Sequence, residues 1–284
     1  MRLRMFRMLA LLLCVLTVHP LHAGGPWPAG TGHGYLKLGQ RLISARYFFN
    51  LDGDVIPITT TRVWTSSLYA EYRLSERLTL KAYAPFFFRT TLNEVRYLQS
   101  GRIEPGDALS SFGDSDLGVS YALIKDKPFV LGTTVMLGLP LGNPGGGETG
   151  LLQSGDGEFN QLVKLEAGYS FYPKPVFING SLGFNHRTRG FSEEFHAGFD
   201  AGIMLKDRVT LIFKSYLVRS FRNGSAPAAG TGLFSNNIQY LSFGPEVNVR
   251  LGKHLGLSGG VYGAQAATNV LAAPSFDLGV FAKF

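Results

Sequence analysis

The segment Val163-Lys164-Leu165-Glu166-Ala167-Gly168-Tyr169-Ser170-Phe171 alternates, residue by residue, between apolar positions and positions that are polar or lack a side chain. Successive side chains of a β-strand point to opposite faces of a sheet, so this segment has one apolar and one polar face. The same period of two recurs at residues 64–74, 78–84, 195–201 and 241–251. The pattern predicts a chain built almost entirely of β-strands.

Twelve segments of this kind follow one another. They are residues 33–49, 62–74, 77–90, 114–124, 128–140, 159–172, 175–187, 193–205, 208–221, 238–251, 254–265 and 275–284. Short polar turns at 75–77, 125–127, 173–175, 206–208 and 252–254 alternate with connections that are mostly longer, at 50–61, 91–113, 141–158, 188–192, 222–237 and 266–274. Tight turns at one end and long loops at the other are typical of outer-membrane barrels, whose turns lie in the periplasm. An even number of strands places both termini at the periplasmic rim.

The composition excludes two other classes of protein. Charged residues make up 17% of the 284 residues and aromatic residues 13%, with 36 glycines. A disordered chain would be richer in charge and poorer in aromatic residues. A helical membrane protein needs apolar runs of about 18 residues or more, and no run here is that long at a mean hydropathy of +0.09. The remaining classes are a secreted all-β protein and a β-barrel in lipid.

Residues 1–23 have the layout of a secretory signal peptide. Arg2, Arg4 and Arg7 precede the apolar stretch 8–18, and Ala23 offers a small residue for cleavage. An uncleaved N-terminal anchor is the alternative. Removal of the three arginines lowers the formal net charge from +7 to +4, too little to indicate a nucleic-acid partner. The single cysteine of the chain lies within residues 1–23, so the expected mature domain, 24–284, has no disulfide and no thiolate metal site.

The distribution of charge favours a barrel over a soluble β-sandwich. A sandwich buries its apolar faces against each other, whereas lipid itself accepts an apolar face and closure removes unpaired strand edges. The polar face carries nine basic and seven acidic residues: Lys37, Arg41, Glu71, Arg73, Lys81, Arg89, Asp116, Lys164, Glu166, Glu194, Asp200, Lys214, Glu246, Arg250, Asp277 and Lys283. The sequence therefore predicts an all-β, closed, antiparallel, up-and-down transmembrane barrel of about twelve strands. These charges would line its lumen, together with the aromatic residues Tyr69, Tyr83, Phe87, Tyr240 and Phe281.

Four polar residues fall on the lipid side if the alternation is strict, namely Gln40, His186, Ser215 and Arg219. His186 and Arg219 lie near the outer rim, where a charge costs about 0–1 kcal/mol. A β-bulge at residues 44–47 would shift the register of the first strand.

The C-terminal strand, 275–284, ends on an aromatic residue. Phe276 and Phe284 share the apolar face of this segment. A terminal aromatic on an alternating strand resembles the assembly signal of Gram-negative outer-membrane proteins, which implies the barrel-assembly machinery as a partner. A chance terminal phenylalanine is the alternative.

Several short stretches, most of which contain glycine, resemble the outer-membrane family named after the phenol meta-cleavage pathway. They are residues 32–38, 76–80 leading to Ala84-Pro85-Phe86, 112–118, 137–142 and 155–159. The resemblance implies a channel in the outer membrane, surrounded by lipid and lipopolysaccharide, for small solutes with hydrophobic or aromatic compounds as candidates. It assigns no ligand to any residue.

No set of residues predicts catalysis or a bound cofactor. Four histidines follow the signal peptide (His33, His186, His196 and His254), and no serine motif around them resembles an outer-membrane phospholipase. The acidic pairs Asp114 with Asp116 and Asp156 with Glu158 are interpreted as turn-forming residues, with calcium binding as the alternative. The glycine run at 143–147 lacks the Lys-Ser/Thr of a phosphate loop and is interpreted as a flexible outer loop.

The predicted function is passive passage of small solutes through a charge-lined lumen, without enzymatic activity, cofactor or metal. Loops 91–113 and 141–158 would gate the lumen or recognise solute. Two alternatives stay open: a non-conducting structural or adhesive barrel, and a lipid-modifying enzyme that uses His186 or His196. Paired charges could also brace the lumen shut.

Overall fold

The computed structural model of the chain describes residues 30–227 and 234–284, and the predicted signal peptide, 1–23, lies outside these residues. The described residues form strands, turns and loops, without any helix. Accordingly, a search of this part of the chain for helices able to cross a bilayer finds none.

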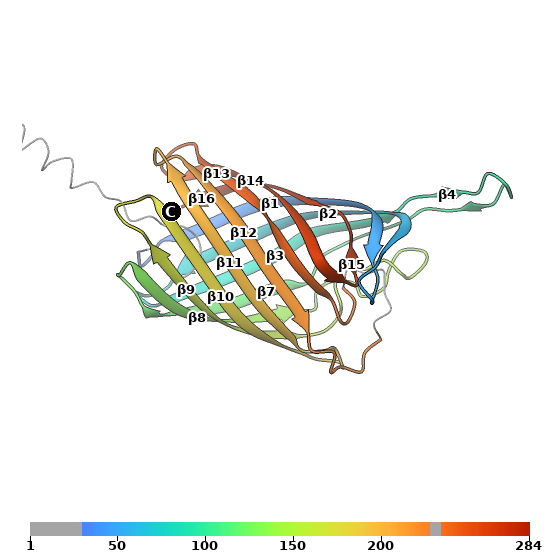
Figure 1. The fold of residues 1–284 in the computed structure, drawn as a ribbon, viewed down its shortest axis with the longest axis horizontal. Helices are drawn as coiled ribbons and strands as arrows, with labels where there is room; N and C mark the ends of the chain where they lie inside the picture. Colours follow the sequence, from blue (N-terminus) through green and yellow to red (C-terminus); the bar gives the residue numbers. More distant parts are fainter. Residues whose placement is uncertain (1–29, 228–233) are drawn as a thin grey trace, which may run out of the picture.

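Twelve antiparallel strands close into a barrel (Figure 1). They are β1 (Gly34–Phe49), β2 (Val55–Arg73), β3 (Leu78–Leu92), β7 (Ser115–Ile124), β8 (Phe129–Leu139), β9 (Asn160–Ser170), β10 (Val176–Arg187), β11 (Glu194–Leu205), β12 (Val209–Ser220), β13 (Gln239–Arg250), β14 (Leu255–Thr268) and β16 (Ser275–Lys283). Each strand pairs with the next one along this list. β1 pairs on its other side with β16, with Lys37 opposite Phe281, and this pairing closes the cylinder. The fold class predicted from the sequence is confirmed.

The two ends of the barrel differ. At the turn end, connections of three to five residues join the strands, and both β1 and β16 have their outer termini there. The other end, the loop end, carries connections 50–54, 93–114, 140–159, 188–193, 221–238 and 269–274. This asymmetry agrees with the sequence prediction, because polar residues and prolines interrupt the alternation only briefly at one end.

Strands β2 and β3 extend beyond the predicted boundaries at the loop end. Residues 50–61 were predicted as a loop, but β2 begins at Val55 and pairs with β1 from there onward. Residues 91–113 contain three further short strands, β4 (Val95–Arg96), β5 (Ile103–Glu104) and β6 (Asp107–Ser111), and β6 pairs with β3. A last short strand, β15 (Val270–Leu271), pairs with β1. The hairpin of β4 and β5 reaches far beyond the barrel at the loop end (Figure 1).

Two β-bulges change which side chains point inward. The predicted bulge in β1 is confirmed, because the pairing with β2 shifts between Ala45 and Tyr47. A second bulge, in β3, was not predicted: Leu68 pairs with Ala84, but Ser66 pairs with Phe87. Pro85 and Phe86 together lie opposite Ser67, and Pro85 has no backbone N–H to donate to a neighbouring strand.

The outer wall of the barrel is apolar. Large hydrophobic side chains such as Leu165, Leu182 and Leu278 are 48%, 57% and 68% exposed there. The register also places all four predicted exceptions on this wall. Gln40 and Ser66 pair across β1 and β2, and the Ser66 hydroxyl donates a hydrogen bond of 3.0 Å to the Gln40 side chain. His186, Ser215 and Arg219 lie in the same outward rows, the first and the last beside the loop end.

Candidate functional site: the barrel interior and its loop-end chamber

The inward rows of the strands carry most of the predicted charges. From the turn end toward the middle of the barrel these include Arg73, Arg250, Lys37, Glu71 and Lys81. Other inward residues form ion pairs with one another. Arg41 binds Asp277 at 2.7 Å (Nε to Oδ1), and Lys214 binds Glu246 at 3.0 Å. Lys164, Glu166, Glu194, Asp116, Asp200 and Lys283 also point inward by register.

The ion pair of Lys81 with Glu166 joins two strands that are not neighbours in the barrel wall. Lys81 of β3 lies 3.7 Å from Glu166 of β9 (Nζ to Oε2) and 4.0 Å from Glu71 of β2. Strands β7 and β8 separate β3 from β9 along the wall, so the Lys81–Glu166 contact spans the interior. Since Lys164 also approaches Glu166, at 3.8 Å, paired charges narrow the middle of the barrel.

Arg89 and Phe87 were predicted to line the lumen, and this placement is wrong. Phe87 pairs with Ser66, and Arg89 pairs with Trp64, in the outward rows of β2 and β3. Arg89 is exposed and donates a hydrogen bond to Ser110 of β6. The bulge at Pro85 reverses the alternation, so Phe88 and Thr90 point inward instead. The other four predicted aromatic residues lie in inward rows; Phe281, for example, stacks on Tyr35 with ring centroids 5.7 Å apart.

Part of loop 140–159 enters the loop-end mouth of the barrel, whereas Pro144, Gly145 and Gly147, in the segment predicted as a flexible outer loop, are exposed. Leu152, Ser154 and Glu158 in this loop have no exposed surface. The inward-pointing Thr90 of β3 donates a hydrogen bond to the carbonyl of Gln153, and the Ser154 hydroxyl donates to the carbonyl of Phe112. The loop is therefore attached to the inside of the wall.

Asp107 at the start of β6 holds the tip of the same loop. Its carboxylate accepts hydrogen bonds from the backbone N–H groups of Glu148 and Thr149 and from the Thr149 hydroxyl. The hydroxyl bond is the main cause that lowers the pKa of Asp107 to about 2. Gly147 packs against this carboxylate at φ +77°, where a Cβ would lie 2.4 Å from Oδ2. Glycine at this position therefore permits the close approach.

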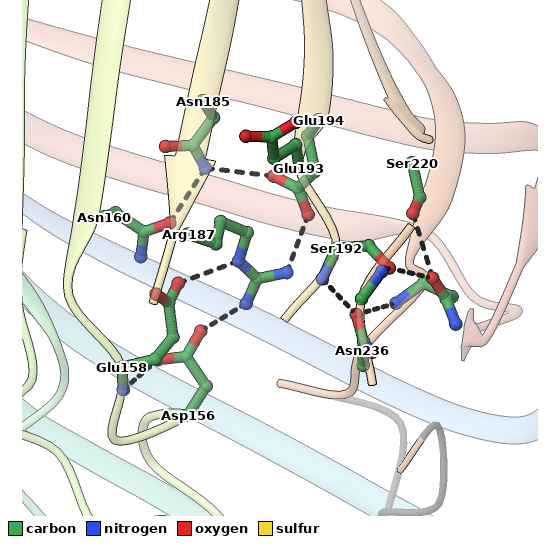
Figure 2. A network of polar contacts seen from close by, with 12 residues as sticks. Asp156, Glu158, Asn160, Asn185, Arg187, Ser192, Glu193, Glu194, Ser220 and Asn236 are labelled. Carbon is green, nitrogen blue, oxygen red and sulfur yellow. Dashed lines mark hydrogen bonds and ion pairs between the residues drawn. The ribbon is translucent and has the colours of Figure 1, made fainter. Parts of the chain in front are cut away.

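Arg187, the last residue of β10, joins three carboxylates. Its guanidinium donates to Glu158 at 2.7 Å, to Asp156 at 2.7 Å and to Glu194 of β11 at 2.8 Å (Figure 2). The Phe191 ring lies 4.5 Å from its Cζ atom. Arg187 is 7% exposed, and its planar fork of donors suits several carboxylates at once. Two of the three acids come from the loop, so this cluster fixes the loop to the barrel wall.

A second carboxylate pair extends the cluster. Asp114 accepts hydrogen bonds from the backbone N–H groups of Gly142 and Asp156. Burial raises the pKa of Asp156 to about 6. The neighbouring Asp114 also raises this pKa, whereas the positive charge of Arg187 lowers it. Asp114, Asp156 and Glu158 were interpreted as turn formers, and each does bind backbone N–H groups, but Asp156 and Glu158 are also the ion-pair partners of Arg187.

Apolar residues close the other side of the mouth. Phe234, which precedes β13 in the chain, packs on Phe88 of β3 with ring centroids 5.5 Å apart. It contacts a buried cluster of Ala45, Val63, Phe88 and Leu271. Between this apolar side and the Arg187 cluster lies a chamber of about 240 Å³. It is lined by Asp156, Asn160, Arg187, Glu194, His196, Val218, Phe234, Ile238, Tyr240 and Val270.

The two candidate catalytic histidines lie on opposite faces of the wall. His186 points outward and pairs with Glu193 at 2.9 Å. His196 points inward, where its ring nitrogens bond to Glu194 at 3.0 Å and to the Tyr216 hydroxyl at 2.7 Å. Across residues 30–227 and 234–284 neither ring bonds to a serine, and no group of three potential metal ligands occurs.

Sequence reasoning missed Arg187, Phe234 and the inward course of loop 140–159. Arg187 is followed by Arg189 in a polar stretch, and nothing local distinguishes the two. The sequence held only an indirect signal for this ion-pair cluster. Asp156 and Glu158 place two acids directly before the strand that begins near residue 159, and that strand carries few charges of its own.

Comparison with protein-family models finds no match, and comparison with curated protein sequences finds none either. Solved structures do match. One is the COG4313 outer membrane channel from Pseudomonas putida F1, with a TM-score of 0.69 and 14% identity over 93% of this chain and 100% of that one. Another is the translocator domain of the autotransporter NalP from Neisseria meningitidis, with a TM-score of 0.54 and 14% identity over 98% of this chain and 95% of the other.

The NanC porin also matches, with a TM-score of 0.50 and 7% identity over 86% of this chain and 98% of that one. At these identities the likenesses show the fold alone. The barrel implied by the resemblance to the phenol meta-cleavage-pathway family is confirmed, and membership of that family stays a prediction.

Proposed function

We propose that this protein is an outer-membrane channel for the passive passage of small solutes. One observation carries the proposal: a closed barrel has an apolar outer wall, while its inward rows hold charges and surround a chamber. A charged interior inside an apolar cylinder suits a protein whose outer face meets lipid and whose lumen holds water. Solved barrels of this fold include proteins described as an outer membrane channel and as a porin.

The barrel's two ends set its proposed orientation. The turn end, with both strand termini, would face the periplasm, and the loop end would face outward. Residues 1–23 would direct export and leave 24–284 as the mature domain. Phe276 and Phe284 would be recognised by the barrel-assembly machinery, and the apolar wall would contact lipid and lipopolysaccharide.

The proposed path runs from the loop-end chamber past the Lys81–Glu166 pair to the basic residues of the turn end. Loop 140–159 would act as the gate, since it occupies the mouth and is held there by Arg187 and Asp107. Hydrophobic or aromatic compounds are the candidate solutes, supported by the resemblance and by Phe234, Ile238 and Val218 in the chamber wall.

Solute flux into liposomes tests this function. The protein, refolded with its full mature sequence, should admit small neutral and aromatic solutes and exclude solutes larger than the chamber. Planar-bilayer recordings should show small conductance steps. A barrel that is folded by heat-modifiable gel mobility yet gives neither flux nor conductance would contradict the proposal.

A second function, adhesion, is supported by the projecting hairpin of β4 and β5. Leu98 at its tip is 98% exposed, and Tyr97 and Ile103 beside it are 43% and 54% exposed. If the hairpin mediates adhesion, deletion of residues 95–104 should abolish binding of cells to a surface and leave solute flux unchanged.

The third possibility, a lipid-modifying enzyme, requires loss of lipase activity in His186→Ala or His196→Ala.

A further inference from the structure

The chamber at the loop end has two chemically different walls. One wall consists of Asp156, Asn160, Arg187, Glu194 and His196, and the other of Val218, Phe234, Ile238 and Val270, with Tyr240 beside them. An apolar cavity of about 150 Å³ is large enough to bind benzene. A chamber of about 240 Å³ therefore has room for one ring and a short polar arm.

The polar wall has more negative than positive groups. Asp156 and Glu158 of loop 140–159 and Glu194 of β11 contact Arg187, and Asp114, in the segment before β7, accepts a hydrogen bond from the backbone N–H of Asp156. The remaining basic groups are His196, which shares Glu194 with Arg187, and Arg189, which is exposed at the rim near Gly157. Three carboxylates thus contact one buried guanidinium, and a fourth, Asp114, lies beside Asp156. Carboxylates buried without matching cations are costly, so the site favours an additional positive charge.

A buried hydrogen-bond acceptor lies next to this wall. Asn185 is 5% exposed on the inward row of β10, and its amide nitrogen donates to Asn160 at 2.8 Å and to Glu194 at 3.1 Å. The ionised Glu194 carboxylate can only accept a hydrogen bond, which fixes the orientation of the Asn185 amide. Both partners line the chamber. The Asn185 carbonyl oxygen is left without a donor. A buried acceptor of this kind calls for an N–H or O–H group from elsewhere.

We propose that the chamber binds a small organic cation, a protonated amine on an aromatic or aliphatic body, an inference that rests on the proposed channel function. The ammonium group would lie against Asp156 and Glu194 and add a positive charge beside these carboxylates. The apolar body would pack on Phe234 and Ile238. Amines would then be preferred solutes, and neutral or anionic molecules of the same shape would enter more weakly.

Protons are the competing source of positive charge. Burial raises the pKa of Asp156 to about 6, so this carboxyl is protonated in acid and ionised near neutrality. The other charged or titratable groups near it are Asp114, Asp116, Glu158, Glu194, Arg187, His196 and Arg189. Amine binding should therefore tighten as the pH rises from 5 to 7.5, because the amine stays protonated while Asp156 loses its proton.

Isothermal titration calorimetry of the refolded full mature chain in detergent micelles tests this site. The probes are 2-phenylethylamine, the neutral 2-phenylethanol and the anionic phenylacetate. We expect the amine to bind about tenfold more tightly than the alcohol at pH 7.5, and phenylacetate to bind most weakly. Equal binding of the amine and the alcohol would overturn the inference.

Variants assign the binding to the chamber. Asp156→Asn should weaken amine binding about fivefold and leave alcohol binding within about twofold. Phe234→Ala should weaken both. Glu246→Gln is the matched control, because Glu246 is an inward carboxylate that binds Lys214 outside the chamber; equal loss in this variant would overturn the assignment. Binding is measured without flux, so amine binding without any solute passage would reject the channel function and leave the site intact.

Discussion

The guanidinium of Arg187 lies 2.7 Å from the carboxylate of Glu158 (Nε to Oε1), and Glu158 has no exposed surface. The two residues are 29 positions apart: Arg187 is the last residue of β10, and Glu158 lies at the base of loop 140–159. This pair, with Asp156 and Glu194 around it, holds a long loop inside the mouth of the barrel.

Replacement of Arg187 by methionine should release loop 140–159. The substitution leaves Asp156, Glu158 and Glu194 buried without a counter-charge, and loss of one partner of a buried ion pair costs about 3–5 kcal/mol. We expect larger single-channel conductance in planar bilayers and faster proteolysis within the loop.

Arg189→Met is the matched control for this substitution. Arg189 is an exposed arginine two positions further along the chain. Conductance and cleavage should stay at the wild-type level in this variant. If both variants behave alike, Arg187 has no special part in the closure.

Replacement of Lys81 by methionine should change ion selectivity. Lys81 lies between Glu71 and Glu166 across the lumen, so its removal leaves two carboxylates unpaired in the path. We expect the cation-to-anion permeability ratio to rise about twofold, since lumen charges concentrate ions of opposite sign. Reversal potentials in a salt gradient measure this ratio. Lys125→Met, at the turn end beside Glu76, should leave it unchanged.

Closure of loop 140–159 should depend on pH through two carboxyls with opposite shifts. Asp107 has a pKa lowered to about 2 from its ordinary value of 3.8. Its contribution to the stability of the closed loop is therefore present above pH 3.8 and is lost as the pH falls toward 2. Asp156 has a pKa raised to about 6. Its contribution to the stability of the closed loop is therefore complete below pH 3.8 and is lost as the pH rises through 6. Burial raises the pKa of Asp114 and Glu158 as well.

The closed loop should therefore be most stable near pH 4 and open more often at pH 7 than at pH 5. Conductance of the wild-type protein, recorded between pH 4 and pH 8, measures this. Asp156→Asn should remove most of the rise between pH 5 and pH 7. A rise of unchanged size in this variant would mean that another group controls the loop.

The outer wall should tolerate an arginine at its rim but not in its middle. Leu165 lies outward in the middle of β9, and Leu205 ends β11 at the turn end. Leu165→Arg should destabilise the barrel by about 2–4 kcal/mol in lipid and Leu205→Arg by about 0–1 kcal/mol. Urea unfolding in lipid vesicles gives both values. Equal effects at the two depths would contradict a membrane position for this wall.

Local patterns in the sequence were sufficient for the barrel itself. Alternation in segments such as 163–171 assigns each side chain to one of two faces, and this assignment needs no knowledge of the neighbouring strand. Observed strands therefore start and end within a few residues of the predicted ones, except at β2, whose extension pairs with β1 beyond the alternating part. The exceptions Gln40, His186, Ser215 and Arg219 were placed correctly for the same reason.

Arg89 shows where this local rule ends. One additional residue at Pro85 reverses the alternation for the rest of β3, and a bulge is defined by the partner strand as much as by its own residues.

The alternation of residues along the chain, by itself, determined that this protein is a closed twelve-stranded barrel with an apolar outside and a charged inside. Only the tertiary structure decided that loop 140–159 lies within the mouth, that Arg187 rather than Arg189 holds it, and that Phe234 faces the charged cluster across a chamber. The physical reason is the range of the interactions: strand alternation is a property of adjacent residues, whereas closure of the mouth depends on contacts between side chains far apart in the chain, such as Arg187 with Glu158, 29 positions apart, and Phe88 with Phe234.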